Sequence, residues 1–129
     1  MLKTKNDFIN KIHLIISVVI VIPVAIIYAF FPETQFELLP KTIDEHNFYK
    51  AITGLYLGFS MLWIIGLTNT KYLKTALITN VIFMLGLGFG RLLSISIDGF
   101  PTSGYIFGTV AELGLGIYGL WVLKREALD

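Results

Sequence analysis

The chain has no cysteine and almost no net charge. Because its 129 residues include no cysteine, disulfide bonds, thiolate nucleophiles, thiol redox chemistry and cysteine metal sites are excluded. The formal net charge is only +1, and no basic cluster is interleaved with exposed aromatic residues, which argues against nucleic acid as a partner. Hydrophobic residues instead make up 55% of the chain. With a mean hydropathy of +0.75, this composition exceeds what a soluble domain of this length needs for its core.

Four apolar segments approach the length of about 20 residues that a helix needs to cross a bilayer. We place them at 12–31, 50–67, 75–97 and 105–123. This pattern predicts an all-α integral membrane protein, in which residues 1–129 form one four-helix bundle with the lipid bilayer as its surroundings. The stretch Thr42-Ile43-Asp44-Glu45 has the spacing of a capping box, so we expect the second helix to begin before the membrane.

Basic residues are distributed unevenly between the two ends of these segments. One side would hold Lys3, Lys5, Lys11, Lys71, Lys74, Lys124 and Arg125, and the other side only Lys41 and Lys50. Because lysine and arginine concentrate in cytoplasmic loops, this predicts a multi-pass protein of the inner (plasma) membrane with both termini in the cytoplasm. The connection 32–49 and the turn 98–104 then face outward.

The histidines and large aromatic residues fit a membrane interface. His13 and His46 fall on opposite sides of the membrane, so they cannot jointly bind a haem or a metal ion, and we interpret each as an interfacial polar residue. We therefore expect no metal site and no cofactor. The aromatic residues that we interpret as interfacial anchors are Trp63, Trp121, Tyr28, Tyr72, Tyr105 and Tyr118.

Two ionisable residues, Arg91 and Glu112, lie inside the last two apolar segments. A charge deep in a bilayer costs at least about 3 kcal/mol on insertion scales, so such residues usually face the bundle interior and find a partner. Arg91 lies six residues before Ile97, and Glu112 lies seven after Tyr105. Each is therefore about 10 Å below the outer helix ends, at 1.5 Å per residue. We expect the two side chains to form an ion pair across the hairpin.

Further polar residues gather around this pair. Ser94, Asp98, Tyr105 and Thr109 lie in the outer half of the same two segments, and His46 and Lys50 lie near the outer interface. This surplus polarity predicts a small cavity beside the pair, which opens outward. The alternative is a purely structural ion pair that locks the two helices together.

Glycines recur at helical spacing and predict where the helices approach one another. Inside lipid, helix association depends on close van der Waals contact over small residues. The glycines that we expect at such contacts are Gly54 and Gly58, Gly86 and Gly90, and Gly108 and Gly116, the last two on the stripe that carries Glu112.

Three stretches of the sequence resemble a known family. NFYKAITGLYLG (47–58), GRLLSISIDGFP (90–101) and AELGLGIYGLW (111–121) are similar to the four-helix bacterial membrane proteins grouped as domain of unknown function 4345. The resemblance implies that Arg91, Asp98 and Glu112 occupy the family's characteristic polar positions. It implies no activity, and Lys50 stands where an arginine is expected in relatives.

Three functions fit these features. The first is binding, or assisted transport, of a small amphiphile or anion, with Arg91 as the electrostatic anchor and Glu112 setting its orientation. The second is a structural or accessory subunit that forms homo-oligomers or docks a membrane-protein partner through its glycine stripes. The third is an intramembrane enzyme such as an isomerase, with Glu112 as general acid or base. The third fits least, because a carboxylate paired with arginine is a poor proton donor.

The distribution of basic residues predicts where the C-terminus lies. A fluorescent reporter fused after Asp129 should be active in the cytoplasm, and a phosphatase fused at the same position should be inactive. As a control, phosphatase inserted into the turn 98–104 should be exported and active. Phosphatase activity at the C-terminal fusion would contradict the proposed orientation.

Overall fold

Four long helices make up most of the chain. The structure is a computed structural model, and it describes residues 5–35 and 38–128. The long helices are α1 (Lys5–Phe30), α3 (Ile43–Thr68), α4 (Leu73–Asp98) and α5 (Ser103–Leu128). The short helix α2 (Pro32–Gln35) follows α1, and the 3-10 turn η1 (Thr70–Tyr72) joins α3 to α4. Within the described ranges there is no β-strand.

Each long helix is long and apolar enough to cross a membrane. The candidate spans are Phe8–Phe30, Ile43–Thr68, Thr70–Asp98 and Ser103–Arg125. Large apolar side chains such as Val19, Met61 and Ile82 point away from the bundle and are about two-thirds exposed, at 65%, 64% and 67%. Such a surface is stable in lipid and not in water. The protein is therefore an all-α, multi-pass membrane protein, as the sequence predicts.

An N-terminal cap starts α3 well before the expected segment 50–67. The Thr42 hydroxyl accepts a hydrogen bond of 3.1 Å from the backbone N–H of Glu45, which confirms the predicted cap. The Glu45 carboxylate in turn accepts a hydrogen bond of 2.8 Å from the backbone N–H of Lys41, one residue before the position that a capping box uses. These bonds satisfy backbone donors that the start of the helix would otherwise leave unpaired.

A glycine turn joins α4 to α5. Gly99 has a φ of +99°, a conformation that residues with a Cβ rarely adopt. Its backbone N–H donates a hydrogen bond of 3.2 Å to the Ile95 carbonyl, which ends α4. The short connection makes α4 and α5 an antiparallel hairpin, and it fixes which residues of the two helices lie at the same depth.

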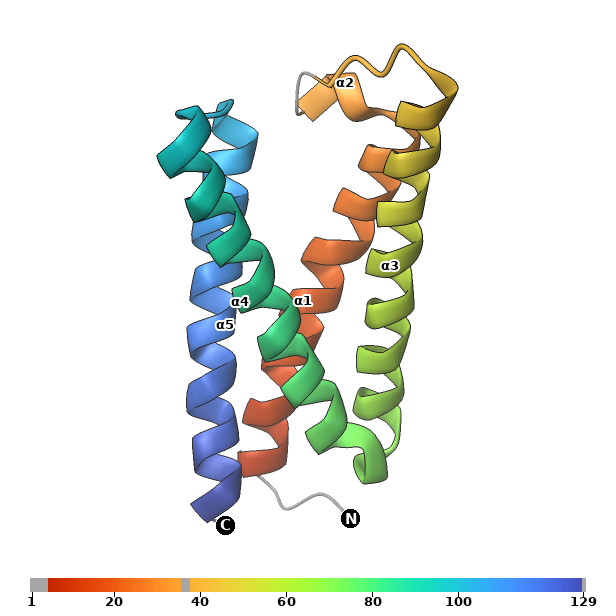
Figure 1. The fold of residues 1–129 in the computed structure, drawn as a ribbon. Helices are drawn as coiled ribbons and strands as arrows, with labels where there is room; N and C mark the ends of the chain where they lie inside the picture. The colour runs from red at the N-terminus through yellow and green to blue at the C-terminus, as the bar shows by residue number, and fades with distance from the viewer. Residues whose placement is uncertain (1–4, 36–37, 129) are drawn as a thin grey trace.

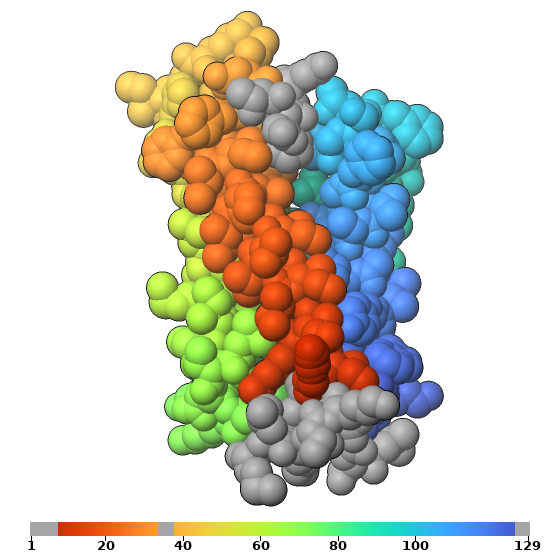
Figure 2. All heavy atoms as spheres, turned by 180° about the vertical axis from the view of Figure 1, so that it is seen from behind, coloured from red at the N-terminus to blue at the C-terminus, as the bar shows by residue number. Residues whose placement is uncertain are grey.

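The four helices form two hairpins that lie side by side at one end and diverge at the other. α1 packs along α3, and α4 packs along α5. Figure 1 shows that the hairpins converge where both termini lie and separate toward α2 and the α4–α5 turn. Seen from behind, α1 runs obliquely across the molecule between α3 and α5 (Figure 2). We call the two ends of the bundle the closed end and the open end.

Large buried side chains fill the closed end. Trp63, Leu14, Leu77 and Val122 come from all four long helices, and none of them is exposed to solvent. The Trp63 ring packs edge-on against Phe83, with ring centroids 5.1 Å apart. Trp63 was expected at an interface, so its place in the core corrects the sequence interpretation. This packing holds the hairpins together at one end and leaves them free to diverge at the other.

Close approach of the helices depends on four glycines: Gly66, Gly88, Gly116 and Gly119. At each of them an added Cβ would overlap a side chain of the neighbouring helix. Gly66 lies against Ala76 and joins α3 to α4, while the other three lie between α4 and α5 or against α1. The small residues therefore determine how near the helix axes come.

Four of the expected packing glycines make no such contact within the described bundle. An added Cβ at Gly54, Gly58, Gly86 or Gly90 would meet no atom within 4 Å. A Cβ added at Gly108 would make only an ordinary contact, 3.9 Å from the Arg91 Nε. Regular spacing shows that glycines share one face of a helix, but it does not show whether that face meets another helix. The expectation that these four glycines lie at contacts between helices therefore does not hold within the described bundle.

Gly66→Ala and Gly58→Ala form a matched test of this packing, because both change a glycine of α3. Gly66→Ala should lower the free energy of unfolding in detergent by about 1–3 kcal/mol, since its Cβ would overlap Ala76 and cannot rotate away. Gly58→Ala should leave stability unchanged or slightly raised, because alanine favours the helix. Equal thermal stability of the two variants would contradict the packing described here.

Candidate functional site

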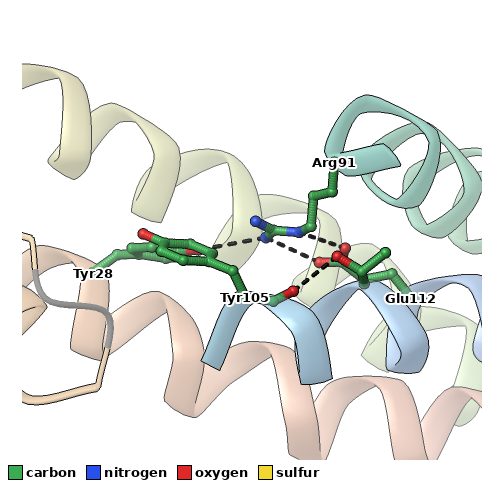
Figure 3. Close-up of polar contacts among 5 residues, drawn as sticks. Tyr28, Arg91, Tyr105 and Glu112 are labelled. Carbon is green, nitrogen blue, oxygen red and sulfur yellow. Dashed lines mark hydrogen bonds and ion pairs between the residues drawn. The ribbon is translucent and has the colours of Figure 1, made fainter. Parts of the chain in front are cut away.

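Arg91 of α4 and Glu112 of α5 form a bidentate ion pair. The Arg91 Nε lies 2.7 Å from the Glu112 Oε1, and the Arg91 Nη2 donates to the Glu112 Oε2 at 3.1 Å. Their side chains are only 20% and 13% exposed, and Figure 3 shows them extended toward each other between the two helices. Two parallel N–H···O bonds are the strongest arrangement available to this pair. The contact expected from their matched depth is therefore present.

The local sequence explains how the two long side chains meet. Gly88 and Gly116 bring α4 and α5 close together about one turn from the pair, on its closed-end side. One turn before Glu112, Gly108 has no side chain, and the Arg91 Nε lies 3.9 Å from the place where its Cβ would be. A larger residue there would crowd the guanidinium. Gly108 is thus part of the site, although it is not a close helix contact.

Tyrosines from both hairpins complete the surroundings of Arg91. The Arg91 Nη2 donates a longer hydrogen bond of 3.4 Å to the Tyr28 hydroxyl of α1. The guanidinium carbon also lies 5.3 Å from the centre of the Tyr105 ring, within the range of a cation–π interaction. The Tyr28 ring packs edge-on against Tyr56 of α3, with centroids 5.8 Å apart. Arg91 therefore joins the two hairpins across the space that separates them (Figure 3).

Two cavities lie on either side of this cluster. The larger has a volume of about 470 Å³, and in it Arg91 and Ser94 of α4 face Tyr49 and Ile52 of α3. The smaller, of about 280 Å³, lies between α1 and α5 and includes Glu112. Both are lined by Tyr28, Tyr56, Leu87, Arg91 and Tyr105. Because the two cavities share these five lining residues, we call them together the cleft.

The other predicted site residues lie at different distances from the pair. Ser94 lines the cleft, and its hydroxyl donates a hydrogen bond of 3.0 Å to the carboxylate of Asp98, which is exposed at the end of α4. Thr109 also lines the cleft, but its hydroxyl donates to the Tyr105 carbonyl of its own helix at 2.8 Å. Asp98 is therefore linked to the site only through Ser94.

The structure places His46 and Lys50 in an adjacent cavity. Both are exposed on the first turns of α3, where they line a cavity of about 430 Å³ beside α2 that shares Tyr28 and Tyr49 with the larger cavity of the cleft. Glu33 of α2 lines the same cavity. The two residues were expected near the outer interface, and they do lie at the open end, but they do not line either cavity of the cleft.

Sequence reasoning missed the contribution of α1 and α3 to this site. Tyr28 was interpreted as an interfacial anchor because it lies near a helix end, yet it is only 7% exposed and touches Arg91. Tyr56, at 6% exposed, was not singled out. α1 is apolar on nearly every face, so its sequence does not show which face turns inward.

A double-mutant cycle tests the ion pair. Arg91→Ala and Glu112→Ala should each lower the free energy of unfolding by about 3–5 kcal/mol, because each leaves the other charge buried without a partner. The double variant should lose much less than the sum of the two. As a control, Arg125→Ala combined with Glu112→Ala should be additive, since Arg125 lies at the closed end of α5. Additive losses for Arg91 and Glu112 would contradict their coupling.

A comparison with protein-family models gives one match over most of the chain. Residues 9–123 match the family described as domain of unknown function (DUF4345), and this range includes the central part of every long helix together with Arg91 and Glu112. No curated protein and no solved structure is similar to the chain at a significant level. The chain therefore belongs to the family of domain of unknown function 4345, the family that its sequence resembles.

Proposed function

We propose that this protein binds a small amphiphilic molecule in the cleft between its two hairpins. One observation carries the proposal: a cavity of about 470 Å³ inside the membrane-spanning region has an arginine on one wall and aromatic and aliphatic side chains on the other. Ligand sites commonly have volumes of about 300–1,000 Å³, mostly apolar walls and a few placed polar groups. An ionisable residue inside a membrane bundle is by default a candidate for function.

The charge balance of the site favours an uncharged or zwitterionic polar group on the ligand. Glu112 contacts both Nε and Nη2 of Arg91, so the pair as a whole carries no net charge. A simple anion would have to compete with the Glu112 carboxylate for the same guanidinium. A hydroxyl, carbonyl or zwitterionic group can instead bind to the pair and to the nearby tyrosine hydroxyls. Among the ligands expected from the sequence, this supports the amphiphile over the anion.

The position of the cavities supports a ligand that enters from the membrane. The larger cavity lies on the α3–α4 side and the smaller on the α1–α5 side, and all four of these helices are candidate spans. Ile52 and Ile95 of the larger cavity, and Val24 and Phe107 of the smaller, offer apolar contacts. An apolar chain can lie along these walls while its polar group reaches Arg91.

We further propose that the protein is in the plasma membrane with both termini in the cytoplasm. The support is the excess of basic residues at the ends of the helices near the termini. The open end of the cleft then faces outward, so that the ligand is exchanged with the outer half of the bilayer.

A second candidate function is that of an accessory subunit, in which the ion pair is purely structural. Gly54 and Gly58 favour it, because they form an exposed GxxxG step on α3 that meets nothing within the bundle. Such a step is suited to a helix of another membrane protein or of a second copy of this chain. In that case the cleft holds only bulk lipid.

Replacing Arg91 with lysine separates the two candidate functions. Arg91→Lys keeps the positive charge, so we expect folding to survive, but a lysine ammonium cannot bind Glu112 in two places and also reach a ligand. Native mass spectrometry should show a small molecule that co-purifies with the wild-type protein and falls at least fivefold in Arg91→Lys. The matched control Arg125→Lys should retain it.

Retention of the small molecule in both arginine variants would show that it does not bind through Arg91. Absence of any adduct from the wild-type protein, in several membrane-mimetic preparations, would reject the binding function and favour the accessory subunit.

A further inference from the structure

A second group of polar side chains lies at the closed end, away from the cleft. His13, Ser60, Trp63 and Asn80 come from three different helices, and each is at most 1% exposed. Five of their side-chain atoms have no hydrogen-bond partner: His13 Nδ1, Ser60 Oγ, Trp63 Nε1, and Asn80 Nδ2 and Oδ1. Within a membrane, each unpaired buried polar group costs several kcal/mol. The closed end therefore contains buried polar atoms whose hydrogen bonds are unsatisfied within the described residues.

The protonation of the His13 ring follows from its contact with α5. His13 Nε2 lies 2.9 Å from the Leu115 carbonyl oxygen. Because a carbonyl oxygen only accepts hydrogen bonds, Nε2 carries a proton and donates it. In the neutral ring, Nδ1 is then an acceptor, and it needs a donor. Ser17 does not supply one, since its hydroxyl donates to the His13 backbone carbonyl at 3.1 Å.

Asn80 lies at the same level as His13. An added Cβ at Gly119 of α5 would lie 2.5 Å from Val81 Cγ2 and 2.9 Å from His13 Nε2, so both side chains reach the same spot on α5. Asn80 is the residue before Val81 on α4, and α4 also contacts α1. Its amide offers two donor hydrogens and one acceptor oxygen. His13 and Asn80 thus bring complementary groups to one level of the bundle.

This level is distinct from the Arg91 site. Asn80 and Arg91 are both on α4, eleven residues apart, which corresponds to about 16 Å along the helix. Met84 and Leu115 lie between them and line the end of the smaller cavity nearest to His13. An apolar layer therefore separates the His13 level at the closed end from the Arg91 level. The hydrogen bonds of the His13 level do not depend on a ligand in the cleft.

We propose that the closed end contains an internal water site, in which at least one water molecule bridges His13 Nδ1 and the Asn80 side chain. A buried water typically makes about three hydrogen bonds to polar groups that would otherwise be unsatisfied. It donates to His13 Nδ1, accepts from Asn80 Nδ2 and keeps a second hydrogen for Asn80 Oδ1 or for a further water. The bridge satisfies the His13 acceptor inside the bundle core.

Nuclear magnetic resonance of the isotope-labelled protein in lipid nanodiscs tests this water site. The His13 ring nitrogens should show the tautomer with the proton on Nε2, and His46→Gln identifies the His13 signals because the chain has only these two histidines. Water should give magnetisation-transfer cross-peaks to the His13 ring and to the Asn80 amide. Asn80→Leu should remove the cross-peak to His13. The control Thr53→Val should retain it, because the buried Thr53 hydroxyl already donates to the Ala25 carbonyl at 2.7 Å.

Two results would overturn the water site, and both can be read in the wild-type protein alone if Asn80→Leu does not fold. One is a scalar coupling across a direct hydrogen bond from Asn80 Nδ2 to His13 Nδ1. The other is the absence of any water cross-peak to the His13 ring. Neither result bears on ligand binding at Arg91, because the measurement uses only atoms of the closed end.

Discussion

The bidentate ion pair between Arg91 and Glu112 is the interaction on which the open end of the bundle depends. Two charges can remain inside a membrane-spanning region only if their geometry compensates for lost solvation. That geometry requires α4 and α5 to keep one register and one separation. The glycine turn at Gly99 sets the register, and the close contacts at Gly88 and Gly116 set the separation. In return, the pair holds the guanidinium on the wall of the cleft and in contact with Tyr28 of the other hairpin.

The closed and open ends are stabilised by different interactions. Buried side chains such as Trp63 and Leu77 pack the closed end densely, and close glycine contacts bring its helices together. At the open end the hairpins separate, which is tolerated in a bilayer because lipid chains solvate apolar walls as well as another helix does. Only the polar groups there need partners, and Arg91 finds them in Glu112 and in tyrosines of both hairpins. A cleft with one polar wall and one apolar wall is the result, and this contrast suits an amphiphile.

Much of the helix architecture can be predicted from the sequence, because helix length, caps and turns are local properties. The cap at Thr42 and the ion pair across a short hairpin follow from spacing alone. The sequence does not show which faces of α1 and α3 turn inward. In a soluble protein the polar face of a helix shows which side is outside, whereas in lipid both faces are apolar and this signal is lost. Tyr28 and Trp63 were assigned to interfaces as aromatic anchors, and Gly54 and Gly58 of α3 were expected at helix contacts that they do not make within the described bundle.

The central claim is that a cleft separates the two hairpins at the depth of Arg91, and if its open end faces outward, as proposed, water reaches this depth beside the lipid. Because the chain has no cysteine, a single introduced thiol reports on one position. Gly90 lines the larger cavity with room for a side chain, and its neighbour Phe89 is 60% exposed on the outside of the bundle. In lipid nanodiscs, Gly90→Cys should react with a charged, water-soluble thiol reagent, since the thiolate forms only where water reaches it. Phe89→Cys, at nearly the same depth but facing lipid, should react at least tenfold more slowly. Equally slow labelling at the two positions would contradict the cleft.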